Sequence, residues 1–526
     1  MVPRPSCAAP TPRWKGRRLQ GLFAHTAHDA AVATRLSGEP QLTLMLTAGG
    51  DERIALDPAT RRNRYGVTPT PAETEIFFSS STASAPTRRG FEAALADWRA
   101  LGAGLPLPDW FETLRARIRD AYGTPDCEVV LAPSGTETEY LALVAALAAA
   151  PGPLTNLVVA PQETGRGVLL AAHGAHFLPT APFQGDVTPG ERIAGFDAAD
   201  IRVETIEIRD ASGALRPTED VAETALRAAR RALAGGRSVL AHYLAVSKTG
   251  RTGLDLEAID AIHALAPDRV TIVADCCQLR TTPEQIRALL RRGFLVAITG
   301  SKFAGGPPFC GALLLPASLC ARFGAFTAPS GLAGHSSRLD WPDRLREQLN
   351  IASCNDANLG LGLRWSAALP EIERFVATPR TEALRAQARF RREVGALAGE
   401  CDALLAIPDE PGVEDFSGTI APVKIYGVDG HFLDEADLQV IRRAMLAPLP
   451  GVSAILQRPI HLGQPVPMGA GAGLRFCMSA PMIADLCEKL TAGVAFETAF
   501  APIAADLRLA FEKLHLILSQ EQRGEA

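Results

Sequence analysis

A single lysine follows an apolar run in the stretch ITGSKFAGGPPFCGALLLP, which begins at residue 298. The 526-residue chain has only six lysines, and arginine supplies most of its positive charge. Either cation is costly to desolvate at the end of a buried strand, so the use of lysine here needs a reason. A buried lysine amine can lose its proton and can form a Schiff base, whereas a guanidinium stays charged. Lys302 is therefore a candidate for covalent chemistry.

Two further polar groups follow apolar runs. Asp275 stands near the end of VTIVADC, and Gln278 follows three residues later. The carboxylate either accepts hydrogen bonds from loop amides or faces a cationic partner such as a protonated ring nitrogen. Ser134, Gly135 and Thr136 form a hydroxyl-rich turn directly before a helical pattern. Such a turn is either an ordinary helix cap or a site for an anion such as phosphate.

More hydroxyl groups stand at equivalent positions. Thr299 and Ser301 adjoin Lys302, and Ser247 follows the apolar run SVLAHYL. An anion-binding turn, a buried acid and a reactive lysine are together what pyridoxal phosphate (PLP) requires. The lysine holds the aldehyde, the acid keeps the pyridine nitrogen protonated, and the turn binds the phosphate.

The elements that would position these groups alternate along the middle of the chain. Short runs rich in Val, Ile and Leu predict seven strands, at 127–134, 156–161, 201–208, 238–244, 270–276, 294–300 and 310–316. Helical patterns lie between many of them, with Thr218 and Thr282 as expected N-caps. Strands buried on both faces and alternating with helices indicate a mostly parallel sheet with helices on both sides. Only nine residues, 301–309, join the last two strands, so one of these strands is expected to be antiparallel.

The chain is long enough for more than one domain. We predict an N-terminal arm with a few helices (1–105), a large α/β domain (106–335), a helical connection (336–400) and a smaller α+β domain (401–526). The basic, Pro-rich start of the arm reads as a disordered tail without the apolar core of a secretory signal.

Bulk composition narrows the functional classes. The chain is 47% hydrophobic and 21% charged, and its net charge of −5 argues against a general nucleic-acid binder. The apolar run at 140–150 is too short to span a bilayer, so no membrane association is expected. Ten cysteines without a CxxC pair suggest reduced thiols in a cytoplasmic protein and argue against a metal site.

The order SGTE, DCCQ, TGSK and CGALLLP resembles the class V aminotransferases, a family of fold-type I PLP enzymes that includes cysteine desulfurases, kynureninases and serine–glyoxylate aminotransferases. The resemblance implies a fold-type I α/β architecture with a seven-stranded, mostly parallel sheet and PLP as cofactor. It covers roughly residues 125–320. In it, Lys302 matches the Schiff-base lysine, Asp275 the partner of the pyridine nitrogen, and Gln278 a residue near the ring hydroxyl. Four further residues match phosphate contacts, namely Gly135, Thr136, Thr299 and Ser301.

Other matches are looser. Asn355 or Asn358 corresponds to a phosphate contact made across the homodimer that is usual in this family, or else serves as a helix cap. Arg475, in GAGLRFCMSAP, matches an arginine that binds the substrate carboxylate, or else has a structural or surface role. The family usually has His where Ser301 stands. Thr164 or Gly165 falls where the family offers a side chain that stacks on the ring.

The leading expectation is a PLP-dependent aminotransferase that acts on an amino acid or a related amine. A PLP-dependent lyase, whether a desulfurase, a β-eliminating enzyme or a decarboxylase, is the alternative, because the fold does not choose between them. A desulfurase also needs a cysteine nucleophile, and only Cys354 stands in a polar, loop-like context. A non-catalytic PLP-fold protein is the remote alternative.

Overall fold

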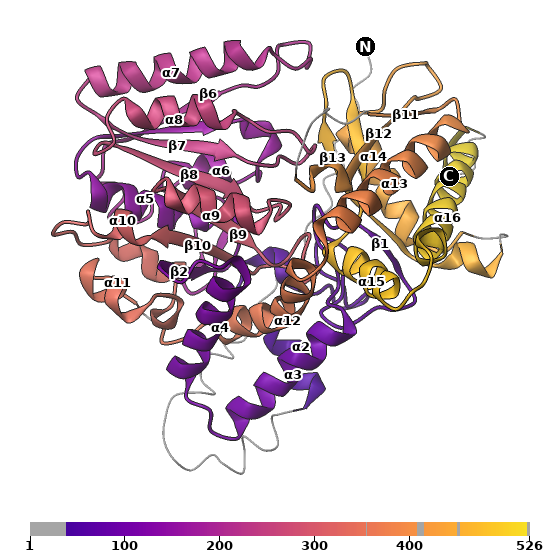
Figure 1. The fold of residues 1–526 in the computed structure, drawn as a ribbon, viewed down its shortest axis with the longest axis horizontal. Helices are drawn as coiled ribbons and strands as arrows, with labels where there is room; N and C mark the ends of the chain where they lie inside the picture. Colours follow the sequence, from indigo (N-terminus) through magenta and orange to yellow (C-terminus); the bar gives the residue numbers. More distant parts are fainter. Residues whose placement is uncertain (1–37, 354, 408–414, 450–452, 523–526) are drawn as a thin grey trace, which may run out of the picture.

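We describe the chain from a computed structural model, which covers residues 38–353, 355–407, 415–449 and 453–522. Two sheets make up its framework, and Figure 1 shows the larger to the left and the smaller to the right. The basic tail and Cys354 lie outside the described residues. Within them, no helix is both long enough and apolar enough to cross a bilayer.

The larger sheet has seven strands in the order β2-β10-β9-β8-β7-β3-β6. These are β2 (Cys127–Ala132), β3 (Leu154–Val159), β6 (Ile201–Ile206), β7 (Ser238–Leu244), β8 (Val270–Cys276), β9 (Leu295–Thr299) and β10 (Gly311–Pro316). Strands β6, β3, β7, β8 and β9 are parallel, and β10 runs antiparallel to both β9 and β2. The predicted sheet and the antiparallel strand that follows the short 301–309 connection are confirmed.

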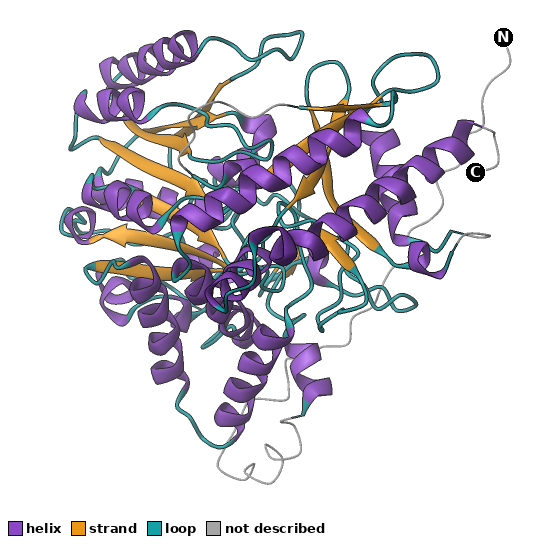
Figure 2. Ribbon diagram, turned by 45° about the vertical axis from the view of Figure 1, so that its right-hand side comes forward, coloured by secondary structure: helices purple, strands orange, loops and turns teal. Residues whose placement is uncertain are grey.

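Helices cover both faces of the large sheet (Figures 1 and 2). On one face lie α4 (Leu107–Tyr122), α7 (Thr218–Ala234), α8 (Leu256–Ala264) and α9 (Pro283–Arg291). On the other lie α5 (Thr138–Ala149), α6 (Val168–Ala172) and α10 (Ala317–Cys320). Alternate strand residues point into the two resulting cores, as with Val296 on the α9 side and Leu295 on the α5 side. Burial on both faces explains why the strands are apolar almost throughout.

The smaller sheet has five strands in the order β1-β13-β14-β12-β11. They are β1 (Ile76–Phe78), β11 (Leu404–Ala406), β12 (Ile420–Ile425), β13 (Ile460–Pro467) and β14 (Ala472–Cys477). Helices α13 (Arg380–Gly399), α14 (Glu435–Leu446), α15 (Ala480–Thr491) and α16 (Phe496–Gln522) pack around it. Strand β1 comes from the N-terminal part of the chain and pairs in parallel with β13. The first and last parts of the chain therefore share one sheet.

Helix α12 (Leu359–Val376) lies between the two sheets and packs on α3 (Arg88–Gly102), α4 and α15. The remaining helices are α2 (Glu39–Met45) and α11 (Asp343–Gln348). A short hairpin, β4 (Thr180–Ala181) and β5 (Gly185–Asp186), and six 3-10 turns complete the described structure, the turns being η1 (Glu52–Ile54), η2 (Pro161–Glu163), η3 (Ser330–Gly334), η4 (Arg338–Asp340), η5 (Ser417–Thr419) and η6 (Ala454–Gln457).

Candidate active site

A pocket of about 540 Å³ opens where the parallel strands of the large sheet end. Its wall combines strand ends of the large sheet with segments from the N-terminal arm and from β13 and β14 of the small sheet. Ligands of open α/β sheets bind at this carboxyl edge. Of the residues predicted from the sequence, Gly135, Thr136, Asp275, Gln278, Thr299, Ser301, Lys302 and Arg475 all line this pocket. Ser247 and Asn358 do not line it.

Lys302 lies in the turn that follows β9. Gly306 N donates to Gly300 O (3.0 Å), which closes the turn, and a Cβ at either glycine would come within 2.6 Å of Ala368 Cβ on α12. The turn therefore packs so closely on α12 that these two positions accept no side chain. The Lys302 amine makes no hydrogen bond or ion pair with any described residue, and burial lowers its pKa below the ordinary 10.5. A lowered pKa raises the fraction of neutral, nucleophilic amine.

Asp275 lies near the end of β8, the central strand of the seven-stranded sheet. Its Oδ1 accepts a hydrogen bond from Cys277 N (2.9 Å), and the Cys277 thiol also hydrogen-bonds the Asp275 carboxylate. Two buried groups lie behind it, Glu139 on α5 and His242 on β7. Burial and the charge of Asp275 raise the pKa of Glu139 well above its usual value, and burial lowers the pKa of His242 to about 4. His242 is therefore neutral at pH 7, and the raised pKa of Glu139 favours its protonated form.

The turn formed by Ser134, Gly135 and Thr136 lies at the N-terminus of α5. A Cβ at Gly135 would come 2.8 Å from Cys277 Sγ, so the turn can approach the end of β8 only with glycine there. The Gly135 N–H has no acceptor among the described residues, and Thr136 N donates to Ser134 Oγ (3.1 Å). A free N–H beside a helix N-terminus favours an anion. The sequence left open that this turn is an ordinary helix cap. The N-cap residue of α5 is instead Glu137, and its side chain makes no capping hydrogen bond.

Three of the predicted polar residues are tied to other groups. Thr299 Oγ1 donates to Cys277 O (2.7 Å), and Gln278 donates to Ser81 O (3.2 Å). Ser247 Oγ donates to Glu163 Oε2 (2.5 Å), which also accepts from Thr249 and pairs through its other oxygen with Arg209. Ser247 thus completes a buried polar cluster behind the pocket wall.

Ser301 differs from these three residues. It lines the pocket, and its hydroxyl makes no hydrogen bond to a described residue.

Asn358 and Arg475 have well-defined local roles. Asn358 is the N-cap of α12, where Oδ1 accepts from Leu361 N (3.0 Å) and Nδ2 donates to Gly49 O (2.8 Å). Its predicted contact with a second subunit stays a prediction. The Arg475 guanidinium is buried and donates to Gln464 O, Lys248 O and Thr82 Oγ1 at 2.7, 3.1 and 3.0 Å. These bonds use three of its five N–H groups and leave one on each terminal nitrogen.

Sequence reasoning missed several pocket residues from the N-terminal arm. Arg53 pairs with Asp51, reaches Ser134 Oγ (3.4 Å) and lies between the rings of Phe177 and Phe309. It therefore adds positive charge beside the 134–136 turn. Residues 79–83 (SSSTA) supply Ser81 and Thr82, and the Ser-rich run after the apolar IFF was the available signal. Arg53 carries no comparable local signal.

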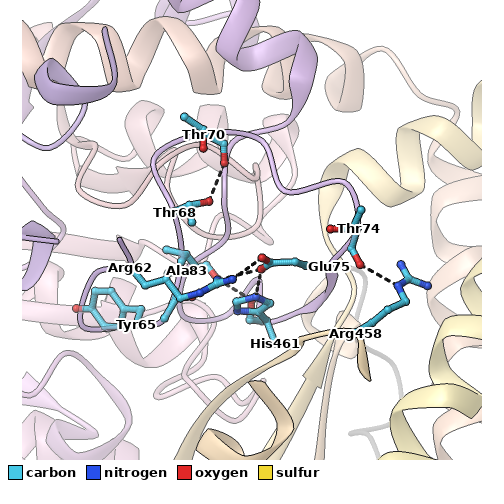
Figure 3. Close-up of polar contacts among 12 residues, drawn as sticks. Arg62, Tyr65, Thr68, Thr70, Thr74, Glu75, Ala83, Arg458 and His461 are labelled. Carbon is cyan, nitrogen blue, oxygen red and sulfur yellow. Dashed lines mark hydrogen bonds and ion pairs between the residues drawn. The ribbon is translucent and has the colours of Figure 1, made fainter. Parts of the chain in front are cut away.

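A partly buried ion pair holds the part of the arm that carries Tyr65, another pocket residue. Arg62 donates to both oxygens of Glu75 (2.5 and 3.0 Å), and His461 on β13 bonds the same carboxylate (2.6 Å), as Figure 3 shows. Burial raises the pKa of Glu75, but the hydrogen bonds and charges of His461 and Arg62 outweigh this and lower it to about 2. The arm is thereby anchored to the small sheet.

No family model matches the chain, and no curated protein matches it. Solved structures do match. A C-DES variant with glycine covalently linked to its PLP cofactor is 12% identical over 83% of this chain and 96% of its own, with a TM-score of 0.51. A cysteine desulfurase from Thermococcus onnurineus NA1 is 15% identical (80% and 96% covered, TM-score 0.49), and a ureidoglycine–glyoxylate aminotransferase from Bacillus subtilis is 13% identical (85% and 98%, TM-score 0.46).

This chain therefore has the same overall fold as that C-DES variant, and this is the α/β fold that the sequence predicted. At such low identity the likeness extends to the fold alone.

Proposed function

We propose that this chain binds PLP covalently through Lys302 and acts as an aminotransferase on an amino acid or a related amine. One observation carries the proposal. A lysine amine without a partner among the described residues and a partly buried carboxylate line one pocket, beside a helix N-terminus with a free N–H. The group that satisfies all three needs an electrophilic carbon, a protonated ring nitrogen and a phosphate, and PLP has this combination.

Different residues would bind different parts of the cofactor. Gly135, Thr136 and Ser301 would bind the phosphate, with Arg53 adding charge beside them. Asp275 Oδ2 would accept a hydrogen bond from the ring N–H and keep that proton in place. Thr299 stays a predicted phosphate contact, although its hydroxyl proton is directed at Cys277 O.

PLP bound here would supply an electron sink that takes the amino group from one amino acid and passes it to a 2-oxo acid. Lys302 Nζ, whose pKa burial lowers, would hold the aldehyde group of the cofactor covalently. Once a substrate amine displaces it, the same nitrogen would move a proton from the substrate Cα. Arg475 would bind the substrate carboxylate through its two remaining N–H groups.

The cysteines that the structure describes favour transamination over desulfuration, while Cys354 lies outside them. Cys277 is the one described cysteine in the pocket wall, and burial together with Asp275 raises its pKa well above that of an ordinary thiol. A desulfurase needs a thiolate, and a protonated thiol is a poor nucleophile. Cys310 and Cys477 are buried outside the pocket wall. Elimination and decarboxylation need no thiolate and remain the alternatives that an experiment must separate, as does a PLP-binding protein without activity.

The test is a half-reaction with PLP-loaded protein, single amino acids as donors and no acceptor. A transaminase converts the cofactor to its amino form once per site, and a 2-oxo acid restores the starting absorption. Continued release of ammonia, sulfide or carbon dioxide over many turnovers would make the enzyme a lyase instead. No spectral change with any donor would favour the non-catalytic alternative.

We also propose a cytoplasmic homodimer. The described cysteines are all free, as is usual in a reducing compartment. Light scattering on the purified protein tests the dimer, and a monomeric mass at micromolar concentration contradicts it.

A further inference from the structure

Half of the basic side chains in the described pocket wall have an acidic partner. Arg53 pairs with Asp51, Arg64 with Glu52 and Arg166 with Glu435, while the pocket acid Glu163 pairs with Arg209. Among the described residues that line the pocket, the basic groups without such a partner are Lys302, Lys248 and Arg475. The proposed cofactor accounts for Lys302 and for Asp275. Two positive charges, Lys248 and Arg475, are then left in the substrate part of the pocket.

The backbone of Lys248 makes two hydrogen bonds, whereas its side-chain amine makes none with the described residues. Its N–H donates to Glu163 O (3.0 Å), and its carbonyl accepts from Arg475 Nη1 (3.1 Å). Lys248 Nζ makes no hydrogen bond or ion pair with any described residue, although it lines the pocket. A hydrogen bond thus holds the Arg475 head against the Lys248 backbone, and both residues face one cavity.

This arrangement is unfavourable without a ligand. Burial, and then the charges of Arg475, Lys302 and Arg166, lower the pKa of Lys248 to about 7. Neighbouring like charges and desolvation both disfavour the ammonium form, and an anion bound beside it reverses both effects. Arg475 is likewise buried, and burial lowers its pKa to about 10.

We propose that Lys248 and Arg475 together bind two separate anionic groups of one ligand, so that the substrate is an amino acid with an acidic side chain. Resting on the proposed function, this assigns the α-carboxylate to Arg475 and the side-chain carboxylate to Lys248. A neutral amino acid would leave the buried Lys248 amine without a polar partner, whether or not the amine is protonated. Sites that leave a buried polar group unpaired reject the poorer ligand strongly, by factors of about 10² or more.

Binding without chemistry tests the idea directly. Succinate and butyrate both have four carbons and differ by one carboxylate, and titration calorimetry on the PLP-loaded protein compares them. We expect succinate to bind at least about tenfold more tightly, which is a free-energy difference of about 1.4 kcal/mol. Lys248→Gln should abolish this preference and leave butyrate affinity unchanged. Lys489→Gln removes an exposed charge on α15 and should leave both affinities as they were.

Three results would overturn the proposal. Succinate and butyrate could bind equally to the unaltered protein, Lys248→Gln could weaken both ligands equally, or the preference could survive the substitution. Equal weakening would mean that Lys248 and Arg475 share one carboxylate. Thermal melting of each variant shows whether it is folded, and a charge-retaining Lys248→Arg variant should keep part of the succinate preference.

A separate measurement distinguishes failure of this proposal from failure of the cofactor proposal. Borohydride reduction with PLP, followed by peptide mapping, reports whether Lys302 holds the cofactor. If PLP and borohydride label Lys302 but succinate binds no more tightly than butyrate, the two-anion site is refuted and the cofactor proposal stands. A Lys248-dependent succinate preference in protein that PLP does not label keeps the two-anion site and refutes the cofactor.

Discussion

At the scale of single residues, Asp275 is expected to govern the chemistry without governing cofactor binding. Asp275→Asn keeps the volume and the hydrogen bond from Cys277 N but removes the charge that holds a proton on the ring nitrogen. Turnover should fall by at least about 10²-fold, as when other groups that stabilise developing charge are removed. PLP retention should change little, because the phosphate would be held by the 134–136 turn and not by Asp275. Steady-state rates and cofactor content measure the two effects separately.

Glu139 provides the control for that substitution. Burial and the nearby charge of Asp275 raise its pKa, which favours the protonated form, and glutamine has the shape of a protonated glutamate. Glu139→Gln should therefore keep near-normal turnover although the residue lies directly behind Asp275. Near-normal turnover in Asp275→Asn would show that another group faces the ring nitrogen.

The pH dependence of covalent capture follows from the environment of Lys302. Burial lowers its pKa below 10.5, so the neutral amine is populated at a lower pH than for a free lysine. The rate of labelling by PLP and borohydride should rise with pH to a midpoint below 10.5 and map to Lys302. Rate measurements from pH 6 to pH 11 with an isolated lysine peptide as reference test this. A midpoint equal to that of the peptide, or a label on Lys248, would contradict the assignment.

The candidate site was predictable where its residues stand at strand ends. Lys302, Asp275 and the 134–136 turn each follow an apolar run, and the parallel sheet brings such ends to one edge. Ser247 also stands at a strand end, yet its hydroxyl is directed to Glu163, and only packing decides that direction. Arg53 could not be found in this way, because it reaches the pocket from an irregular segment with no repeating pattern.

At the scale of elements, the anchor of the N-terminal arm should make stability depend on pH (Figure 3). The folded pKa of Glu75, about 2, lies below its ordinary 4.5, so its contribution is complete above pH 4.5 and is lost as the pH falls toward 2. Glu75→Gln should cost about 1–3 kcal/mol at pH 7, the range for hydrogen bonds to charged groups. The variant should also show a weaker loss of stability between pH 4.5 and 2. Urea unfolding across this pH range measures both.

Glu73→Gln serves as the neighbouring control. Glu73 pairs with Arg88 (2.7 Å), but both side chains are more than half exposed. Exposed pairs contribute little to stability, so this variant should unfold nearly as the unaltered protein does. Equal losses in the two variants would mean that burial of the Glu75 cluster adds nothing.

The elements of the large sheet were predictable because burial on both faces leaves continuous apolar runs. Each of the seven expected strands exists, with ends shifted by up to two residues. Thr282 is the expected N-cap and forms a full capping box with Gln285. Thr218 is not an N-cap, because Pro217 takes that position and α7 begins at Thr218 itself. The pairing of β1 with β13 joins residues nearly 400 positions apart, and local patterns carry no information about it.

At the scale of the whole molecule, the pocket depends on chain segments that are far apart in sequence. The buried guanidinium of Arg364 on α12 donates to Phe309 O (2.7 Å) in the wall of the pocket and to Ala48 O (2.6 Å) in the arm. Gly49 O accepts from both Arg364 and Asn358. The arm that carries Arg53 is thus held by α12, and α12 also packs against the Lys302 turn.

Arg280 makes the most extensive connection of this kind. It is fully buried after β8, and its guanidinium donates to Thr419 Oγ1 (2.8 Å) of the small domain and Ser80 Oγ (2.9 Å) of the arm. It also donates to the carbonyl and side-chain oxygens of Gln278 (both 2.9 Å) and lies 4.8 Å from the ring centroid of Phe303. One side chain therefore joins the large sheet, the small domain and the arm.

Arg280→Met keeps an apolar stem of similar length but leaves these four oxygens without their donor. We expect a loss of about 2–4 kcal/mol, because buried acceptors that lose a partner cost about 1–3 kcal/mol each and hydroxyls can reorient to recover part of it. Arg280→Lys should recover little, since a single ammonium cannot reach Thr419, Ser80 and Gln278 with the planar geometry of the guanidinium. Arg291→Met, on the exposed face of α9, removes an arginine nearby in sequence and should change stability by less than about 0.5 kcal/mol.

Urea unfolding measures all three variants. Limited proteolysis of the Arg280 variants should show faster cleavage near residues 79–86, where the arm leaves the small sheet. If Arg280→Met unfolds like Arg291→Met, the two sheets and the arm are held together by apolar packing, and Arg280 merely fills space between them.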